Sequence, residues 1–243
     1  MKIRRKLWAW LIAIVLVLAV AAAGATVWVE SLYPVQEAAQ AALAPAQNVT
    51  VQSTDDSIVF IPDEPEVGFI FYPGALVPAE AYAPLLRALA ENGVLCVAVH
   101  MPLRLAVLDL NAADGIANQY PEITRWAIGG HSLGGAMAAS YAAKNAADYD
   151  ALVLLAAYST AELPESLSVV SVYGDQDQVM KREKYAEYRG NLPENAVEVI
   201  IPGGNHAQFG DYGHQKGDGV ASITAQEQLD ATVQSILSVL AGE

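Results

Sequence analysis

The sequence is poor in cysteine and in recognisable cofactor motifs. Cys96 is the only cysteine among 243 residues, so no disulfide can form within the chain. It lies in the apolar run 94–99, and we expect it to be a small buried hydrophobic residue. There is no cysteine pair and no His-x-x-x-His spacing, and no glycine-rich dinucleotide fingerprint follows the first strand. We therefore expect neither a metal nor another cofactor.

Positive charge is also scarce. The chain has 13 Lys and Arg residues against 27 Asp and Glu, which gives a net charge of −14. Four of the basic residues lie within positions 1–6, so the remainder carries nine basic residues against all the acidic ones. Such an acidic domain repels nucleic acid and anionic lipid headgroups. We expect no nucleic-acid partner, and the charge gives no indication of the oligomeric state.

The basic start precedes 23 residues without a charge, 7–29. As a helix this segment is long enough to cross ~30 Å of hydrocarbon, and the basic flank places the rest of the chain outside the cytoplasm. Small residues at 23–25 allow the alternative of a cleaved signal peptide, which would release the domain. We favour an uncleaved anchor in the cell membrane, because the apolar run continues past that site. The predicted organisation is a transmembrane helix at 1–29, a tether at 30–47 and a folded domain at 48–243.

Strands and helices alternate through that domain. Apolar runs predict strands over 49–52, 57–61, 68–72, 94–100, 125–129, 151–157, 168–173 and 197–201. Amphipathic or helix-forming stretches predict helices over 79–92, 104–118, 136–144, 181–189 and 225–240. Nearly continuous apolar strands that alternate with helices indicate a mostly parallel sheet covered on both faces. We expect an α/β fold in which the first two strands form a hairpin.

A Gly-x-Ser-x-Gly sequence runs from Gly130 to Gly134, between a predicted strand and a predicted helix. A nucleophile elbow requires this context, because its serine must sit on a sharp turn with the hydroxyl exposed above the sheet. The five-residue pattern alone also fits an ordinary glycine-rich turn. The flanking elements favour the elbow, and the positive end of the following helix dipole suits acyl transfer. Ser132 is therefore the candidate nucleophile.

An acid and a base follow this serine in the chain. Ser132, Asp177 and His206 all come after predicted strands, where the ligand site of a parallel sheet lies. Serine needs an adjacent base, imidazole titrates near neutral pH, and a carboxylate can orient it. Asp175 competes for the acid role. We prefer Asp177, because the turn after Gly174 lets it fold back toward the histidine loop, and we expect Asp175 to stabilise that turn.

The other three histidines are weaker candidates for the role of the base. His100 ends a strand ahead of the elbow. His131 occupies a variable slot of the elbow and is expected to pack against the site. His214 lies in a polar loop and is expected to be exposed.

An oxyanion hole needs two backbone donors. We expect the amide of Leu133, directly after the serine, to be one of them. The other should come from the loop 72–76 after the third strand. Pro73 has no N–H, so we nominate Ala75, with Gly74 as second choice.

Four stretches within residues 57–242 give the chain a resemblance to a known superfamily, namely 71–74, 127–135, 174–177 and 204–210. It resembles the α/β-hydrolase superfamily, and more closely the small bacterial hydrolases without a cap domain that are related to dienelactone hydrolase. The resemblance implies the α/β-hydrolase fold and a catalytic triad at Ser132, Asp177 and His206. Dienelactone hydrolase has cysteine at the elbow, so the serine favours ester chemistry. It also excludes the aspartate nucleophile of the dehalogenase and epoxide hydrolase branches.

Together these features predict a membrane-anchored, extracytoplasmic serine hydrolase of small or accessible carboxylic esters. The connection 158–167 is too short for a cap domain, so the site should be open. A non-catalytic binding module on the same fold is the rival interpretation, and the complete set of three groups argues against it. An amidase or peptidase with the same triad stays open, because specificity depends on pocket shape.

Overall fold

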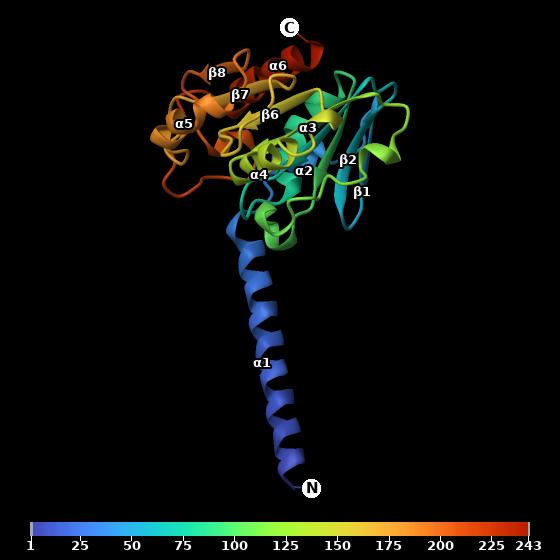
Figure 1. Ribbon diagram of the computed structural model, residues 1–243, viewed down its shortest axis with the longest axis vertical. Helices are drawn as coiled ribbons and strands as arrows, with labels where there is room; N and C mark the ends of the chain where they lie inside the picture. The colour runs from blue at the N-terminus through green and yellow to red at the C-terminus, as the bar shows by residue number, and fades with distance from the viewer. Residues whose placement is uncertain (1, 243) are drawn as a thin grey trace.

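One eight-stranded sheet forms the centre of the molecule (Figure 1). The computed structural model describes residues 2–242, except for the side chains of 2–9, 13, 21–23, 25, 30 and 31. The strands are β1 Val49–Ser53, β2 Ser57–Pro62, β3 Val67–Tyr72, β4 Val94–Val99, β5 Arg125–His131, β6 Ala151–Leu155, β7 Ser168–Gly174 and β8 Val197–Ile201. Their order across the sheet is β1-β2-β4-β3-β5-β6-β7-β8.

The sheet is parallel from β4 to β8, and only β2 runs antiparallel to its neighbours. The predicted hairpin is confirmed, with Val49 opposite Pro62 and Ser53 opposite Ile58. The mostly parallel α/β fold is therefore confirmed as well. Its parallel strands all end at the same edge, which is where side chains from separate loops can meet.

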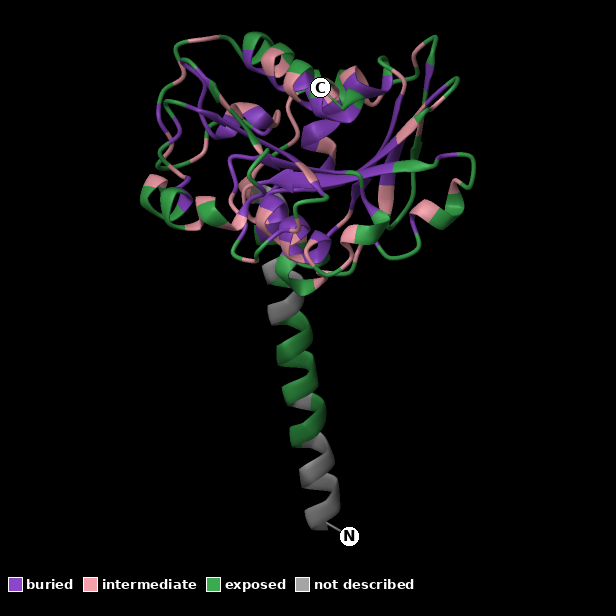
Figure 2. Cartoon of the chain, turned by 45° about the horizontal axis from the view of Figure 1, so that its top comes forward, coloured by how far each residue is buried: buried purple, intermediate pink, exposed green. Residues whose placement is uncertain are grey.

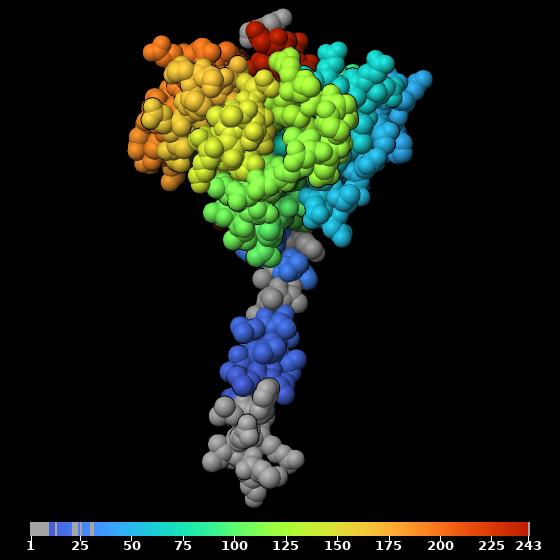
Figure 3. Space-filling model, turned by 45° about the vertical axis from the view of Figure 1, so that its right-hand side comes forward, coloured from blue at the N-terminus to red at the C-terminus, as the bar shows by residue number. Residues whose placement is uncertain are grey.

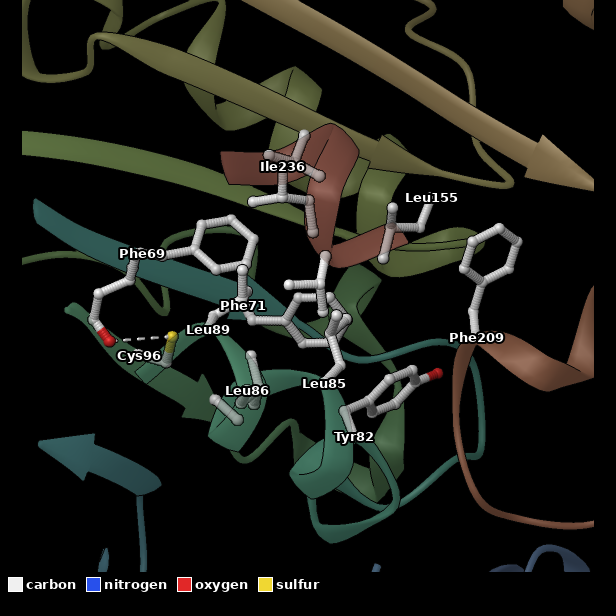
Figure 4. Close-up of a cluster of buried hydrophobic side chains, with 14 of the residues drawn as sticks. Phe69, Phe71, Tyr82, Leu85, Leu86, Leu89, Cys96, Leu155, Phe209 and Ile236 are labelled. Carbon is white, nitrogen blue, oxygen red and sulfur yellow. Dashed lines mark hydrogen bonds between the residues drawn. The ribbon is translucent and has the colours of Figure 1, made fainter. Parts of the chain in front are cut away.

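Helices cover both faces of this sheet, and Figure 2 shows the buried strands between them. The helices of the domain are α2 Glu37–Ala42, α3 Ala83–Ala90, α4 Leu133–Ala142, α5 Arg182–Tyr188 and α6 Ala225–Ala241. Alternate residues of β3 serve two separate cores, as strand geometry requires. Phe69 and Phe71 pack on the face of α3 and α6 (Figure 4), whereas Ile70 and Tyr72 pack on the face of α4. The core on the face of α3 and α6 is called the first core below, and Cys96 is buried in it, as expected.

The predicted helix over 104–118 is wrong. Short 3-10 turns stand in this region instead, η2 Pro102–Arg104, η3 Ala106–Leu108 and η4 Ala117–Gln119. Leu103 and Arg104 have φ angles of 49° and 55°, which a right-handed helix does not admit. The segment forms part of the green surface next to the blue helix in Figure 3. The predicted helix over 79–92 is shorter than expected, because a 3-10 turn, η1 Ala79–Tyr82, precedes α3.

The N-terminal segment forms a helix, α1 Lys2–Leu32, that projects from the sheet domain in Figure 1. The predicted transmembrane segment, 1–29, falls partly outside the described residues, which exclude Met1 and several side chains of α1. Over the positions that are described, no helix combines the length and the apolar character needed to cross a membrane.

Part of the predicted tether packs on the domain. The backbone amides of Gln36 and Ala39 donate hydrogen bonds to the carbonyl and the carboxylate of Asp211, at 3.0 and 2.7 Å. The Arg87 guanidinium donates to the carbonyl of Ala42 at 2.6 Å. Residues 36–42 are therefore fixed to the domain by backbone and side-chain bonds.

Candidate active site

Ser132 stands on a tight turn between β5 and α4. Its φ and ψ angles are 53° and −123°, a combination that is strained for any residue with a Cβ. The turn is held from both sides, because the Ser132 N–H donates to the Leu155 carbonyl at 2.9 Å and the Ser132 carbonyl accepts from the Ala136 N–H at 3.1 Å. Strain that the surroundings maintain in this way is typical of a functional residue.

The two glycines of the motif let this turn pass against the end of β3. A Cβ on Gly134 would lie 2.2 Å from the carbonyl oxygens of both Tyr72 and Pro73. A Cβ on Gly130 would lie 2.4 Å from the Tyr72 oxygen. Both distances are far below van der Waals contact, so only glycine fits.

Two loops at the same edge of the sheet carry the candidate acid and base. Asp177 follows β7 and His206 follows β8. The loops touch at Gly174 and Gly204, because a Cβ on Gly174 would lie 2.1 Å from the Gly204 oxygen. The Asp175 carboxylate accepts the Gly203 N–H at 2.7 Å and so joins the loops at their base.

Asp177 and His206 form a buried pair. The Nδ1–H of His206 donates to Oδ2 of Asp177 at 2.8 Å, and the two side chains are 1% and 0% exposed. Oδ1 of Asp177 accepts the N–H groups of Val179 and Met180, each at 2.8 Å. Burial raises the pKa of the Asp177 carboxyl, but the hydrogen bond and charge of His206 and the two amides outweigh it and lower that pKa overall.

This pairing determines which nitrogen of His206 is available for chemistry. An ionised Asp177 accepts the proton that Nδ1 carries, so Nε2 of the neutral ring is left with a lone pair. Nε2 is buried and has no hydrogen-bond partner among the described residues. His206 is thus arranged to accept a proton from a group that approaches Nε2.

The remaining histidines have different surroundings. The His131 ring lies beside that of His206, with 4.4 Å between the ring centroids, and its Nδ1 is 2.8 Å from the Tyr82 hydroxyl. His100 is apart from this group, with Nδ1 at 3.1 Å from the Asp55 carbonyl oxygen. His214 is exposed, as expected.

Ser132 lines a pocket of about 490 Å³. Val179 and Met180, whose amides bind Asp177, line the same pocket, so the serine and the acid loop share one cavity. Most of its lining is apolar, and the polar members besides Ser132 are Tyr158, Thr160, Lys181 and Lys184. The chain between β6 and β7 forms no helix or strand that would cover the pocket.

The amides nominated for an oxyanion hole lie at the start of α4 and after β3. Leu133 is the first residue of α4, so its N–H belongs to the unpaired first turn of that helix. The Gly74 N–H donates to the Tyr82 hydroxyl at 3.0 Å. This bond occupies the second-choice donor, Gly74, and favours Ala75.

Sequence reasoning missed two buried polar residues beside these loops. Gln228 of α6 is 0% exposed, accepts the Asn205 N–H at 3.0 Å and donates to the Asn205 carbonyl at 2.8 Å. It therefore holds the residue before His206 from both sides. Tyr82 lies within the predicted helix 79–92, and its hydroxyl contacts the Gly74 amide and Nδ1 of His131. In the sequence, the only indication of these contacts is the glutamine at position 228, within the predicted helix 225–240.

Within the part of the chain that the structure describes, no group of three or more His, Cys, Asp or Glu side chains is placed to hold a metal ion. The candidate site consists of Ser132, His206 and Asp177.

Comparisons with known proteins agree with this architecture. Residues 68–230 match the model of the Alpha/beta hydrolase family. A search of curated proteins finds no match. Among solved structures, Est1E from Butyrivibrio proteoclasticus is 16% identical with a TM-score of 0.55, over 80% of this chain and 100% of that one.

Two further solved structures are similar in fold. Dienelactone hydrolase from Anabaena variabilis is 14% identical with a TM-score of 0.57, over 79% of this chain and 98% of that one. Thermogutta terrifontis esterase 2 is 14% identical with a TM-score of 0.54, over 81% and 96% of the two chains. At these identities the likeness concerns the fold alone. The family match covers more than half of the chain, including the elbow and both loops, so this chain belongs to the alpha/beta hydrolase family.

Proposed function

We propose that this protein is a serine hydrolase that cleaves carboxylic esters through an acyl-enzyme intermediate. The observation that carries the proposal is the buried Asp177–His206 pair, which leaves Nε2 of His206 without a partner at the edge of the sheet where Ser132 stands on a strained elbow. Serine, histidine and aspartate in this chain order are the arrangement of α/β-hydrolases.

The reaction follows from the roles of the three side chains. Oγ of Ser132 attacks the acyl carbonyl carbon while Nε2 of His206 takes its proton. The tetrahedral intermediate collapses, the ester C–O bond breaks, and His206 returns the proton to the departing alcohol. Water then attacks the acyl-serine by the same route, giving its proton to His206, and Ser132 is regenerated as the acid leaves. Asp177 stays ionised and stabilises the imidazolium.

We assign the oxyanion hole to the amides of Leu133 and Ala75. Leu133 follows the nucleophile at the start of α4, where the helix dipole favours negative charge. The bond from Gly74 to Tyr82 supports Ala75 as the second donor. Removing one such donor typically lowers kcat by ~10²–10³-fold.

The pocket beside Ser132 supports small esters with an apolar acyl or alcohol group. Its apolar lining consists of alanine, methionine, valine and leucine side chains, and its volume is about 490 Å³. Pockets of ~300–1,000 Å³ accept small organic ligands. A series of p-nitrophenyl esters from acetate to octanoate measures this preference, and short to medium acyl chains should give the highest kcat/KM.

The location outside the cytoplasm, with the N-terminal segment as a membrane anchor, is a proposal that rests on the sequence. Basic residues at 2–6 precede the uncharged run 7–29. Protease treatment of intact cells tests it, since an exposed domain should be degraded while a cytoplasmic control protein survives. Persistence of the domain under conditions that degrade an exposed control would contradict it.

The activity itself is tested with the full-length chain on p-nitrophenyl butyrate and on the matching p-nitroanilide. The proposal expects turnover of the ester, and preference for the anilide would instead assign the site to amide bonds. A folded wild-type protein that neither turns over these substrates nor reacts with a fluorophosphonate probe would favour the non-catalytic binding module.

A further inference from the structure

A buried hydrogen-bond chain connects the loop after β3 with the residue before Ser132. Tyr82, the last residue of η1, is 0% exposed. Its hydroxyl lies between the Gly74 N–H, at 3.0 Å, and Nδ1 of His131, at 2.8 Å. Figure 4 shows the Tyr82 ring in the first core beside Leu85, with the hydroxyl on the side of Phe209. The Tyr82 hydroxyl thus contacts both the loop after β3 and the residue before Ser132.

The direction of each hydrogen bond in this chain follows from the donor inventory. A backbone N–H only donates, so the Tyr82 oxygen accepts from Gly74. The single phenolic hydrogen is then free to point at Nδ1 of His131, and we assign Nδ1 as its acceptor. A neutral histidine that accepts at Nδ1 carries its proton on Nε2. Burial, and then the neighbouring His206, hold the pKa of His131 well below its usual value, in agreement with a neutral ring.

A neutral His131 suits the chemistry of its neighbour. With ring centroids only 4.4 Å apart, a charge on His131 would oppose the charge that His206 acquires when it takes a proton. The other rings around His131 are Tyr82, Phe209 and Tyr212, and each of them is also buried. These rings therefore shield His131 from water.

The hydrogen bonds of Tyr82 also fix the loop that carries the second oxyanion donor. A Cβ on Gly74 would lie 2.8 Å from both Nδ1 of His131 and the Tyr82 oxygen, so the loop backbone is in direct contact with the pair. Leu76, two residues on, has a φ of 64° and donates its N–H to the Arg104 carbonyl at 2.7 Å. The Ala75 peptide lies between these two anchored positions.

We propose that Tyr82 is a positioning residue for this hydrolase. Its hydroxyl fixes the Gly74–Ala75 backbone relative to Ser132, and it holds His131 in the neutral form with the proton on Nε2, beside His206. The inference rests on the proposed function, since it assigns to Ala75 the role of oxyanion donor. It predicts that Tyr82 acts mainly on the transition state and little on substrate binding, because the oxyanion exists only there.

Tyr82→Phe removes the hydroxyl and keeps the ring. With p-nitrophenyl acetate, we expect kcat to fall by ~10–100-fold while KM stays within ~3-fold, because a displaced donor loses transition-state contact. A trifluoromethyl ketone, whose adduct with Ser132 carries an oxyanion, should bind more weakly by a similar factor. His131→Asn keeps a side-chain acceptor near the position of Nδ1, and it should retain more activity than His131→Leu.

Tyr72→Phe is the matched control. Tyr72 is also 0% exposed, and its hydroxyl also bridges two backbone groups, donating to the Leu110 carbonyl and accepting the Ala113 N–H, both at 2.9 Å. It packs on the other face of the sheet. The backbone of Tyr72 is unchanged in this variant, and the hydroxyl that it loses contacts only Leu110 and Ala113 among the described residues. The control should therefore lose stability comparably and keep kcat within ~3-fold of the wild type.

The outcomes separate this inference from the proposed function. An active wild type whose kcat is unaffected by Tyr82→Phe, or is lowered equally by Tyr72→Phe, overturns the positioning role alone. A wild type without esterase activity overturns the proposed function. In that case nitrogen NMR of the imidazoles and amide hydrogen exchange at Gly74 still test the hydrogen bonds of Tyr82 to Gly74 and His131. A proton on Nδ1 of His131, or equal exchange at Gly74 in wild type and Tyr82→Phe, contradicts those bonds.

Discussion

His206 and Asp177 are joined by a hydrogen bond of 2.8 Å although 29 positions separate them in the chain. The contact forms because β7 and β8 are parallel neighbours, so their following loops leave the sheet at the same edge. Asp175 lies only two residues away, but its carboxylate binds the Gly203 amide instead. The two aspartates of one turn therefore have separate tasks.

The first prediction distinguishes these aspartates. Asp177→Asn should lower kcat by ~10³–10⁴-fold, because an amide does not stabilise the imidazolium and favours the wrong tautomer. Asp175→Asn retains an oxygen that can accept the Gly203 N–H, so its kcat should stay within ~3-fold of the wild type. Steady-state kinetics on one p-nitrophenyl ester measure both. The reverse pattern would assign the acid role to Asp175.

A second prediction concerns the strain at the elbow. Ser132→Gly should be more stable than Ser132→Ala by ~1–2 kcal/mol, because glycine adopts a φ of 53° without the Cβ conflict that alanine retains. Both variants lack the hydroxyl, so neither should turn over esters. Urea unfolding measures the difference. Equal stability of the two variants would mean that the turn relaxes at no cost.

The close contact of the elbow with β3 gives a third prediction. Gly134→Ala should destabilise the fold by ~2 kcal/mol or more and abolish activity, since its Cβ would lie 2.2 Å from two carbonyl oxygens. Gly190→Ala is the control, because a Cβ there meets nothing within 4 Å. It should leave both quantities unchanged. Thermal unfolding and ester turnover measure the pair, and a harmless Gly134→Ala would contradict the packing.

The fourth prediction is a dependence of stability on pH. The pKa of His131 is well below 6.5 in the folded chain, so below that pH the unfolded chain binds a proton that the folded one does not. Stability should therefore fall as the pH drops below ~6.5, by at most ~1.4 kcal/mol per pH unit for this one group. The lowered pKa of Asp177 acts in a separate window, where its contribution is lost below about pH 4.

His131→Asn isolates the histidine in that experiment. Its free energy of unfolding, measured in urea from pH 7 to pH 5, should fall less steeply than that of the wild type. Tyr82, Tyr212 and His206 are the titratable groups whose rings face His131, and all three remain in the variant. Parallel curves for the two proteins would show that His131 titrates normally in the folded state.

Local patterns were sufficient to predict most of the sheet and the chain order of the three candidate groups. Apolar runs determine strands, and the elbow requires glycines that the sequence displays. The predicted helix over 104–118 does not form, because the backbone is left-handed at Arg104 and not helical at Leu105 and Asp109. These residue types do not indicate such a conformation in the sequence. The Tyr82–His131 bond joins residues 49 positions apart. Tyr82 fits the apolar face of the predicted helix 79–92, so the sequence alone does not predict its contact with His131.

The central claim is that Ser132 is the nucleophile of an esterase. The most direct measurement combines steady-state hydrolysis of p-nitrophenyl acetate by the full-length chain with mass-spectrometric mapping of the residue that a fluorophosphonate probe modifies. We predict that the wild type turns over the ester and is labelled on Ser132, and that Ser132→Ala falls to the uncatalysed rate and is not labelled. A Ser132→Ala variant as active as the wild type, or a label on another residue, would contradict the account.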